Sequence, residues 1–174
     1  QQHAHLTFSH RTRLRRNAIP RESAMIHFLE KGRNLAEQIP HSFVALVSRI
    51  AVASVFWRSG QTKIAGFSLR PETFVLFQDE YKVPLLPPDA AAYLTTIAEH
   101  VFPVLLVIGL ATRLSALGLL FMTAVIEIFI YPSGWPEHIL WAALLLSIIA
   151  RGPGAISLDR LIWHRAPPAP AFAR

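Results

Sequence analysis

Four apolar segments constrain this chain more than any other feature of its sequence. They cover residues 43–57, 90–110, 114–131 and 135–150. Each is near the ~20 residues with which an α-helix crosses a ~30 Å hydrocarbon core, although the first and last need snorkelling flanks or a thinner bilayer. The segments predict an all-α membrane protein, a four-transmembrane-helix bundle with both chain ends on one side.

Composition favours this interpretation over a soluble helical bundle. Only 16% of the 174 residues are charged and 52% are hydrophobic, whereas soluble domains carry about 25% charged residues. Buried helices of a soluble bundle keep a polar stripe, and residues 104–110 and 114–125 have almost none. The lipid bilayer is therefore the first expected partner, and nothing in the sequence indicates nucleic-acid binding.

The sequence contains no cysteine. Disulfides, thiol redox relays, Cys-ligated zinc and iron–sulfur clusters all need the thiolate, so these classes of site are excluded. The remaining residues show no metal-ligand motif, and no metal site is predicted.

The segments outside the spans divide the chain further. Residues 1–24 carry five arginines against one glutamate and no apolar run, so we interpret them as a basic, disordered extension; the alternative is an arm that binds anionic lipid headgroups. Residues 25–42 are expected to form an N-terminal cytoplasmic or interfacial segment. The membrane domain is predicted over 43–162, followed by a Pro/Ala-rich tail, 163–174.

Basic residues in short flanks predict the orientation, because cytoplasmic flanks are enriched in Lys and Arg. One side of the bundle receives six basic residues, whereas the connection 132–136 has none; the six are Lys31, Arg33, Arg113, Arg151, Arg160 and Arg165. Both termini are therefore predicted to be cytoplasmic, with the long first connection outside.

That long connection contains a further helical pattern. Residues 71–81 place Pro71 at the first helical position and several apolar side chains on one broad face, as an interfacial amphipathic helix does. The prolines of 83–88 end this helix, and Asp89 is expected to cap the next span.

Ionisable residues within spans are costly and are candidates for function. Arg49 lies nine residues before the outer end of the first span and Glu99 lies ten residues after Asp89, so both are expected ~13–15 Å below the outer surface. This depth predicts an Arg49–Glu99 ion pair, with Arg49 also reaching the Glu99 carbonyl that Pro103 leaves free. The pair is either a structural clamp or a polar pocket that holds a ligand headgroup or passes protons.

A second polar group is expected nearer the outer surface. Glu127 and His138 lie at similar height on either side of the tight outer turn. They form either an ordinary interfacial hydrogen bond or, with Lys63 and His100, an outward-facing polar mouth. The different depths of His100 and His138 argue against a haem with two histidine ligands, and no catalytic residue is assigned.

Three sequence blocks resemble the DoxX family of small four-helix membrane proteins, over about residues 43–162. They are WRSGQTKI (57–64) after an Arg in the first span, PVLLVIGLATR (103–113) after a Glu in the second, and ARGPGAISLDRLI (150–162). The loop LFQDEYKVPLLPPDAAAYL (76–94) is similar to a DoxX subgroup encoded beside multinuclear non-haem iron oxidases in copper-associated operons of proteobacteria.

The resemblance implies an accessory protein of a redox or quinone-linked system in the bacterial inner membrane, not an enzyme by itself. Quinone is the cofactor it suggests, at the Arg49/Glu99 site, with other membrane or periplasmic proteins as partners. The missing cysteines exclude dithiol chemistry, so electron transfer would need a bound quinone or a partner. The alternative is a noncatalytic membrane partner or export component for a modified copper-binding peptide in metal stress.

Overall fold

The computed structural model describes residues 19–163, in two units that divide after Pro40. The first unit contains α2 (Ile19–Glu37), with an exposed Arg33–Glu37 ion pair one turn apart at 3.4 Å. The helix therefore extends into the segment predicted to be a disordered extension, of which residues 1–18 lie outside the described part. The same holds for residues 164–174 of the predicted tail.

The second unit contains the four predicted spans. They are α3 (His41–Thr62), α5 (Pro88–Ile108), α6 (Thr112–Val125) with its π-helical continuation η1 (Ile126–Ile130), and α7 (Trp135–Arg151). All four are long and apolar enough to cross a membrane. The prediction of an all-α, four-span membrane protein is thus confirmed, and α3 is seven residues longer than the first apolar segment.

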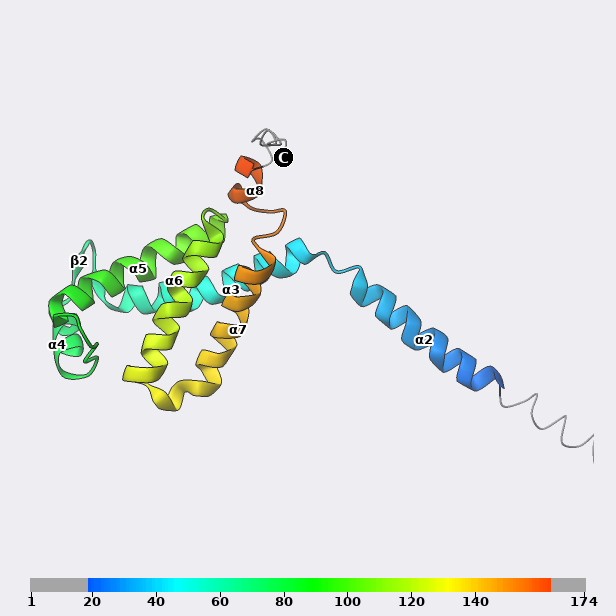
Figure 1. Cartoon of the computed structure of the whole chain (residues 1–174), viewed down its shortest axis with the longest axis horizontal. Helices are drawn as coiled ribbons and strands as arrows, with labels where there is room; N and C mark the ends of the chain where they lie inside the picture. Colours follow the sequence, from blue (N-terminus) through cyan, green and yellow to red (C-terminus); the bar gives the residue numbers. More distant parts are fainter. Residues whose placement is uncertain (1–18, 164–174) are drawn as a thin grey trace, which may run out of the picture. The chain divides into compact units, whose positions relative to one another are not determined.

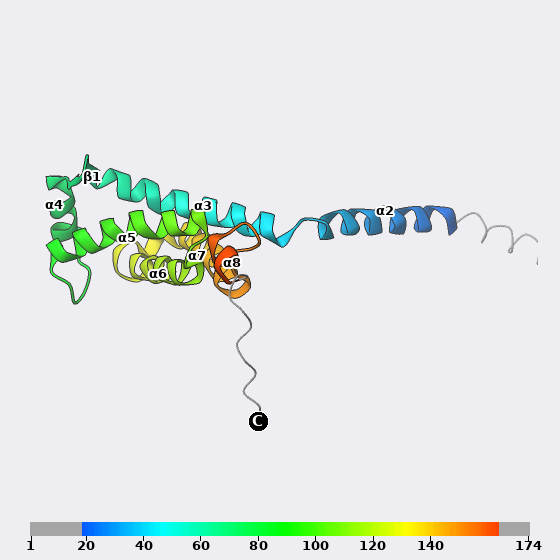
Figure 2. The ribbon, with the colours of Figure 1, turned by 90° about the horizontal axis from the view of Figure 1, so that it is seen from above.

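The four spans pack as two antiparallel pairs. Figure 2 shows α3 and α5 side by side, with α6 and α7 against one face of that pair. In Figure 1, α6 and α7 run away from α3 and α5 toward the turn η2 (Pro132–Gly134). The buried core between the pairs contains the following apolar residues: Val52, Ala53, Phe56, Leu106, Ala116, Leu119, Leu145 and Ile148.

The loop between α3 and α5 is folded, and part of its structure was not predicted. A two-residue hairpin, β1 (Ile64–Ala65) with β2 (Ser68–Leu69), follows α3. The predicted loop helix is present as α4 (Pro71–Asp79), whose Phe77 is buried against the start of α5. The prediction that Asp89 caps α5 is wrong, because α5 already begins at Pro88 and no side chain caps it.

The opposite end of the bundle is closed by a tight turn and a short helix. Gly109 ends α5 in the left-handed conformation (φ +72°), and its N–H is donated to the carbonyls of Leu105 and Leu106. The carboxylate of Asp159, at the start of α8 (Leu158–Trp163), accepts hydrogen bonds from the N–H groups of Ala111 and Thr112. We call this the α8 end, and the end with the 63–87 loop and η2 the loop end.

Candidate functional site

A buried ion pair joins the end of α3 to the middle of α5. The Lys63 Nζ donates to both carboxylate oxygens of Glu99, at 2.7 and 2.9 Å, and lies 3.0 Å from the Ser59 Oγ. Lys63 is 4% exposed and Glu99 2% exposed. A buried ammonium group and a buried carboxylate need to pair with each other in this way, because either charged group without its partner would carry the full free-energy cost of its removal from water.

The predicted Arg49–Glu99 ion pair is therefore wrong. A Cβ on Gly60 would lie 3.1 Å from the Cβ of Glu99, so Gly60, and not Arg49, is level with Glu99. The prediction assumed that α3 ends near Arg58 and that both helices begin at the same outer surface. In the structure α3 continues to Thr62, two residues past Gly60, whereas α5 begins at Pro88, eleven residues before Glu99, so the two helices do not begin at the same depth. Arg49 lies about three turns deeper in the bundle than Gly60.

Arg49 instead holds the α8 end together. Its guanidinium donates from Nη1 to the Leu106 carbonyl at 3.2 Å and from Nη2 to the Ile156 carbonyl at 2.5 Å. The expected bond to the Glu99 carbonyl is replaced by these two. Arg49 is fully buried, so it clamps α3, α5 and the segment before α8 through backbone oxygens.

The Lys63–Glu99 pair lies in the wall of a cavity at the loop end. This cavity has a volume of about 660 Å³ and receives side chains from α3, α4, α5, α6, η1 and α7. Most of its lining is apolar or aromatic, and the polar groups include Ser59, Lys63, Tyr81, Glu99, Glu137 and His138. An apolar cavity with a few converging polar groups is the usual form of a small-molecule site.

His138 reaches this cavity from α7. Its Nδ1 lies 2.6 Å from the Glu127 Oε2, so the predicted hydrogen bond between these residues is present. Glu127 lies in η1, where the chain makes a π turn that is closed by a hydrogen bond from the Tyr131 N–H to the Ile126 carbonyl. Such π turns occur often at functional sites because they rotate side chains out of the regular helical register.

His100 does not join the predicted polar mouth. It follows Glu99 by one residue, which is about 100° around the helix, and lies outside the cavity lining. Its ring nitrogens lie 2.9 Å from the Gln61 Nε2 and 2.7 Å from the Thr96 carbonyl, and its ring packs edge-on against Trp57. Of the six predicted site residues, only Lys63, Glu99 and His138 line the cavity.

Aromatic residues that the sequence did not single out form much of the lining. Phe56 and Trp141 pack edge to face at 5.7 Å, and Trp141 also lies 4.9 Å from the His138 ring. The hydroxyl groups of Tyr81 and Tyr131, which both line the cavity, lie 3.4 Å apart, and burial raises the pKa of the Tyr81 phenol. Trp141 follows His138 by three residues, so both lie on the same face of α7. This spacing is the one sequence signal that could have indicated that Trp141 lines the cavity.

No metal centre is apparent within residues 19–163, where no three His, Asp or Glu side chains converge on one point. Among these residues the bundle has three polar features: the Lys63–Glu99 pair in the loop-end cavity, the Glu127–His138 pair beside it, and the Arg49 clamp at the α8 end.

Comparison with known proteins identifies the family. The DoxX family model matches residues 44–132. An uncharacterized protein of Haemophilus influenzae is 32% identical over 127 residues, which cover 67% of this chain and 82% of that relative. No solved structure shows significant similarity. The four apolar helices and the family match agree, and the chain belongs to the DoxX family of multi-pass membrane proteins.

Proposed function

We propose that this DoxX protein is an accessory membrane protein of a quinone-linked redox system and binds the quinone ring in the loop-end cavity. The observation that carries the proposal is the buried Lys63–Glu99 pair in the wall of an apolar, aromatic cavity within the membrane-spanning bundle. The polar site of the proposal is thus Lys63 and Glu99, without Arg49.

The cavity suits such a ligand in size and in chemistry. Its volume of about 660 Å³ lies within the roughly 300–1,000 Å³ of typical small-molecule sites. Phe56, Tyr81 and Trp141 offer aromatic faces and edges to a planar ring. Lys63 would donate to a ligand carbonyl oxygen in exchange for its 3.0 Å hydrogen bond to the Ser59 Oγ, while its two hydrogen bonds to Glu99 keep the ammonium group in position.

A bound quinone would supply reversible two-electron chemistry that the side chains of this protein lack. The chain's own residues would orient the ring, exclude water and hold a proton at the Glu99 carboxylate. Electrons would have to come from another membrane or periplasmic protein, since the sequence has no cysteine to carry them. For this reason the protein is proposed as an accessory subunit and not as an enzyme alone.

The proposed location is the bacterial inner membrane with both termini in the cytoplasm. Arg113, Arg151 and Arg160 gather at the α8 end, and the turn η2 at the loop end has no basic residue. This orientation puts the cavity nearer the periplasmic side.

A cavity-filling substitution tests the function without touching the ion pair. Ala98 lines the cavity, so Ala98→Leu should abolish the stabilisation that quinone analogues give to the purified protein. Ala124→Leu is the matched control, because Ala124 is exposed on α6 and lies outside the lining. If no quinone in a panel of ubiquinone and menaquinone analogues raises the melting temperature of the wild type, the proposal is wrong.

A second candidate function, as the membrane partner of a modified copper-binding peptide, is favoured by one feature of the loop end. Phe67 and Leu85 are apolar and fully exposed there, as residues of a docking surface are. This candidate predicts that Phe67→Ser with Leu85→Ser, like deletion of the gene, raises copper sensitivity and leaves quinone-dependent respiration intact. Unchanged copper tolerance would eliminate it.

A further inference from the structure

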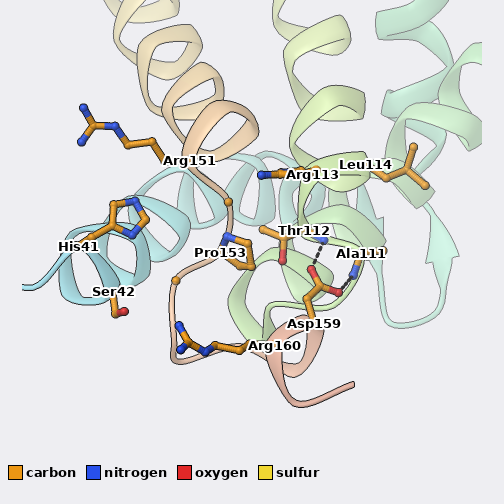
Figure 3. Close-up of a pocket in the computed structure, with 12 residues that line it drawn as sticks. His41, Ser42, Ala111, Thr112, Arg113, Leu114, Arg151, Pro153, Asp159 and Arg160 are labelled. Carbon is orange, nitrogen blue, oxygen red and sulfur yellow. Dashed lines mark hydrogen bonds between the residues drawn. The ribbon is translucent and has the colours of Figure 1, made fainter. Parts of the chain in front are cut away.

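A second cavity lies at the α8 end and shares no lining residue with the first. Its volume is about 910 Å³, and it is bounded by the start of α3, the start of α6 and the turn that follows α7. Figure 3 shows Arg113, Arg151 and Arg160 around this turn, on α6, α7 and α8, with their side chains extending in different directions. Three separate elements thus bring three guanidinium groups to one cavity.

Among the described residues, these three positive charges share the cavity lining with a single carboxylate, which leaves an excess of positive charge there. Asp159 is the only carboxylate in the lining, and both its oxygens accept backbone N–H groups, from Ala111 at 2.8 Å and Thr112 at 2.9 Å. In the described part of the chain, no carboxylate lies within 4.0 Å of any of the three guanidinium groups. Each guanidinium carries five N–H donors in a fork that matches a phosphate group.

Thr112 gives an independent indication of a ligand. Its side chain lines the cavity and is fully buried, and its Oγ1 has no hydrogen-bond partner among the described residues. Buried hydroxyl groups are nearly always paired, since an unpaired one loses its bonds to water without replacement. A ligand oxygen in the cavity would supply the missing acceptor.

We propose that the α8-end cavity binds a phosphate group, carried by an anionic phospholipid or free in solution. Arg113, Arg151 and Arg160 would neutralise it and the Thr112 hydroxyl would donate to one of its oxygens. Leu114 in the lining and Leu161 on α8 are both more than half exposed, so they offer apolar contacts for an acyl chain beside the basic groups. The site is independent of the quinone proposal.

Native mass spectrometry of the full chain, released from mixed micelles, tests the lipid arm. Phosphatidylglycerol should be retained in preference to phosphatidylcholine, and Arg113→Gln with Arg151→Gln should weaken its retention tenfold or more. Arg58→Gln with Lys82→Gln is the charge-matched control, because both residues are exposed in the loop-end half of the molecule and lie outside the cavity. Inorganic phosphate, tested by its effect on the melting temperature, forms the second arm.

Retention of phosphatidylglycerol without a response to phosphate identifies a lipid headgroup site, and a phosphate response in the millimolar range identifies a site for free phosphate. Thr112→Val should lower the affinity severalfold without lowering the melting temperature of the ligand-free protein, because it removes an unpaired buried hydroxyl. Equal affinities for the two lipids with no phosphate response, or equal losses in the control variant, would overturn the proposal.

Discussion

The Lys63 Nζ lies 2.7 Å from the Glu99 Oε2 within an apolar bundle, and neither side chain is more than 5% exposed. Moving both charged groups out of water costs several kcal/mol for each ion. Their mutual attraction balances this cost only when the two groups are close and their remaining hydrogen-bonding atoms are paired. The three hydrogen bonds to Glu99 and the Ser59 hydroxyl meet that condition. The pair is therefore a costly feature, and its position in the wall of a cavity is consistent with a role in binding.

Removing one partner of this pair should destabilise the protein more than removing both. Lys63→Met leaves the Glu99 carboxylate without its counter-charge and should cost about 3–5 kcal/mol of unfolding free energy, whereas Lys63→Met with Glu99→Met should recover most of it. Unfolding in detergent micelles measures both. Arg58→Met, at an exposed position, is the control. A double variant no more stable than the single one would mean that the two charges are not coupled.

The spans could be predicted from the sequence because hydrophobic length alone determines what can cross a bilayer. The partner of Glu99 could not, because Lys63 follows the first apolar segment and the register of α3 against α5 depends on a close approach at Gly60. Depth counted from assumed helix ends cannot detect such an offset. The β1–β2 hairpin was missed for another reason: strands of two residues leave no alternation to detect.

Gly109 should tolerate alanine much less well than Gly66. Both have a positive φ, +72° and +64°, which costs an L-residue about 1–2 kcal/mol. A Cβ on Gly66 meets nothing within 4 Å, but a Cβ on Gly109 would lie 2.8 Å from the Ser157 Cα and would also contact the Arg49 guanidinium. Gly66→Ala should therefore lose only the conformational term, and Gly109→Ala clearly more in the same unfolding assay. Equal losses would show that the α8 segment can move away.

Asp159 should contribute more to stability than Asp89, although both lie near helix starts. Asp159 accepts two backbone N–H groups at the start of α6, whereas Asp89 makes no capping hydrogen bond in α5. Asp159→Ala should cost about 1–2 kcal/mol and Asp89→Ala less than 1, the effect of a helix dipole alone. Asp159→Asn keeps one acceptor oxygen and should fall between them. Thermal unfolding of the three variants gives the order.

Tyr81 should titrate later than an ordinary tyrosine. Burial and, second, the neighbouring Tyr131 hydroxyl raise its pKa. The folded protein therefore holds the phenolic proton more tightly than the unfolded chain, so this contribution to stability is complete below about pH 10 and is lost as the pH rises beyond it. The tyrosinate absorbance of this three-tyrosine chain should show a late component that Tyr81→Phe removes. A difference between the wild-type and variant titrations that has its midpoint near pH 10, as for an ordinary tyrosine, would contradict it.

Arg49 should hold the segment before α8 against the bundle, because its guanidinium donates hydrogen bonds from two different nitrogen atoms. Nη1 and Nη2 donate to carbonyls of two different segments, Leu106 and Ile156, which a single ammonium group reaches less well. Arg49→Met removes both bonds and should cost about 1.5–3 kcal/mol for each, and Arg49→Lys should recover only part of this loss. Amide hydrogen exchange should accelerate in the 152–157 segment of both variants and stay unchanged in α4, which has no contact with Arg49. Uniform acceleration throughout the bundle would instead indicate a general loss of packing.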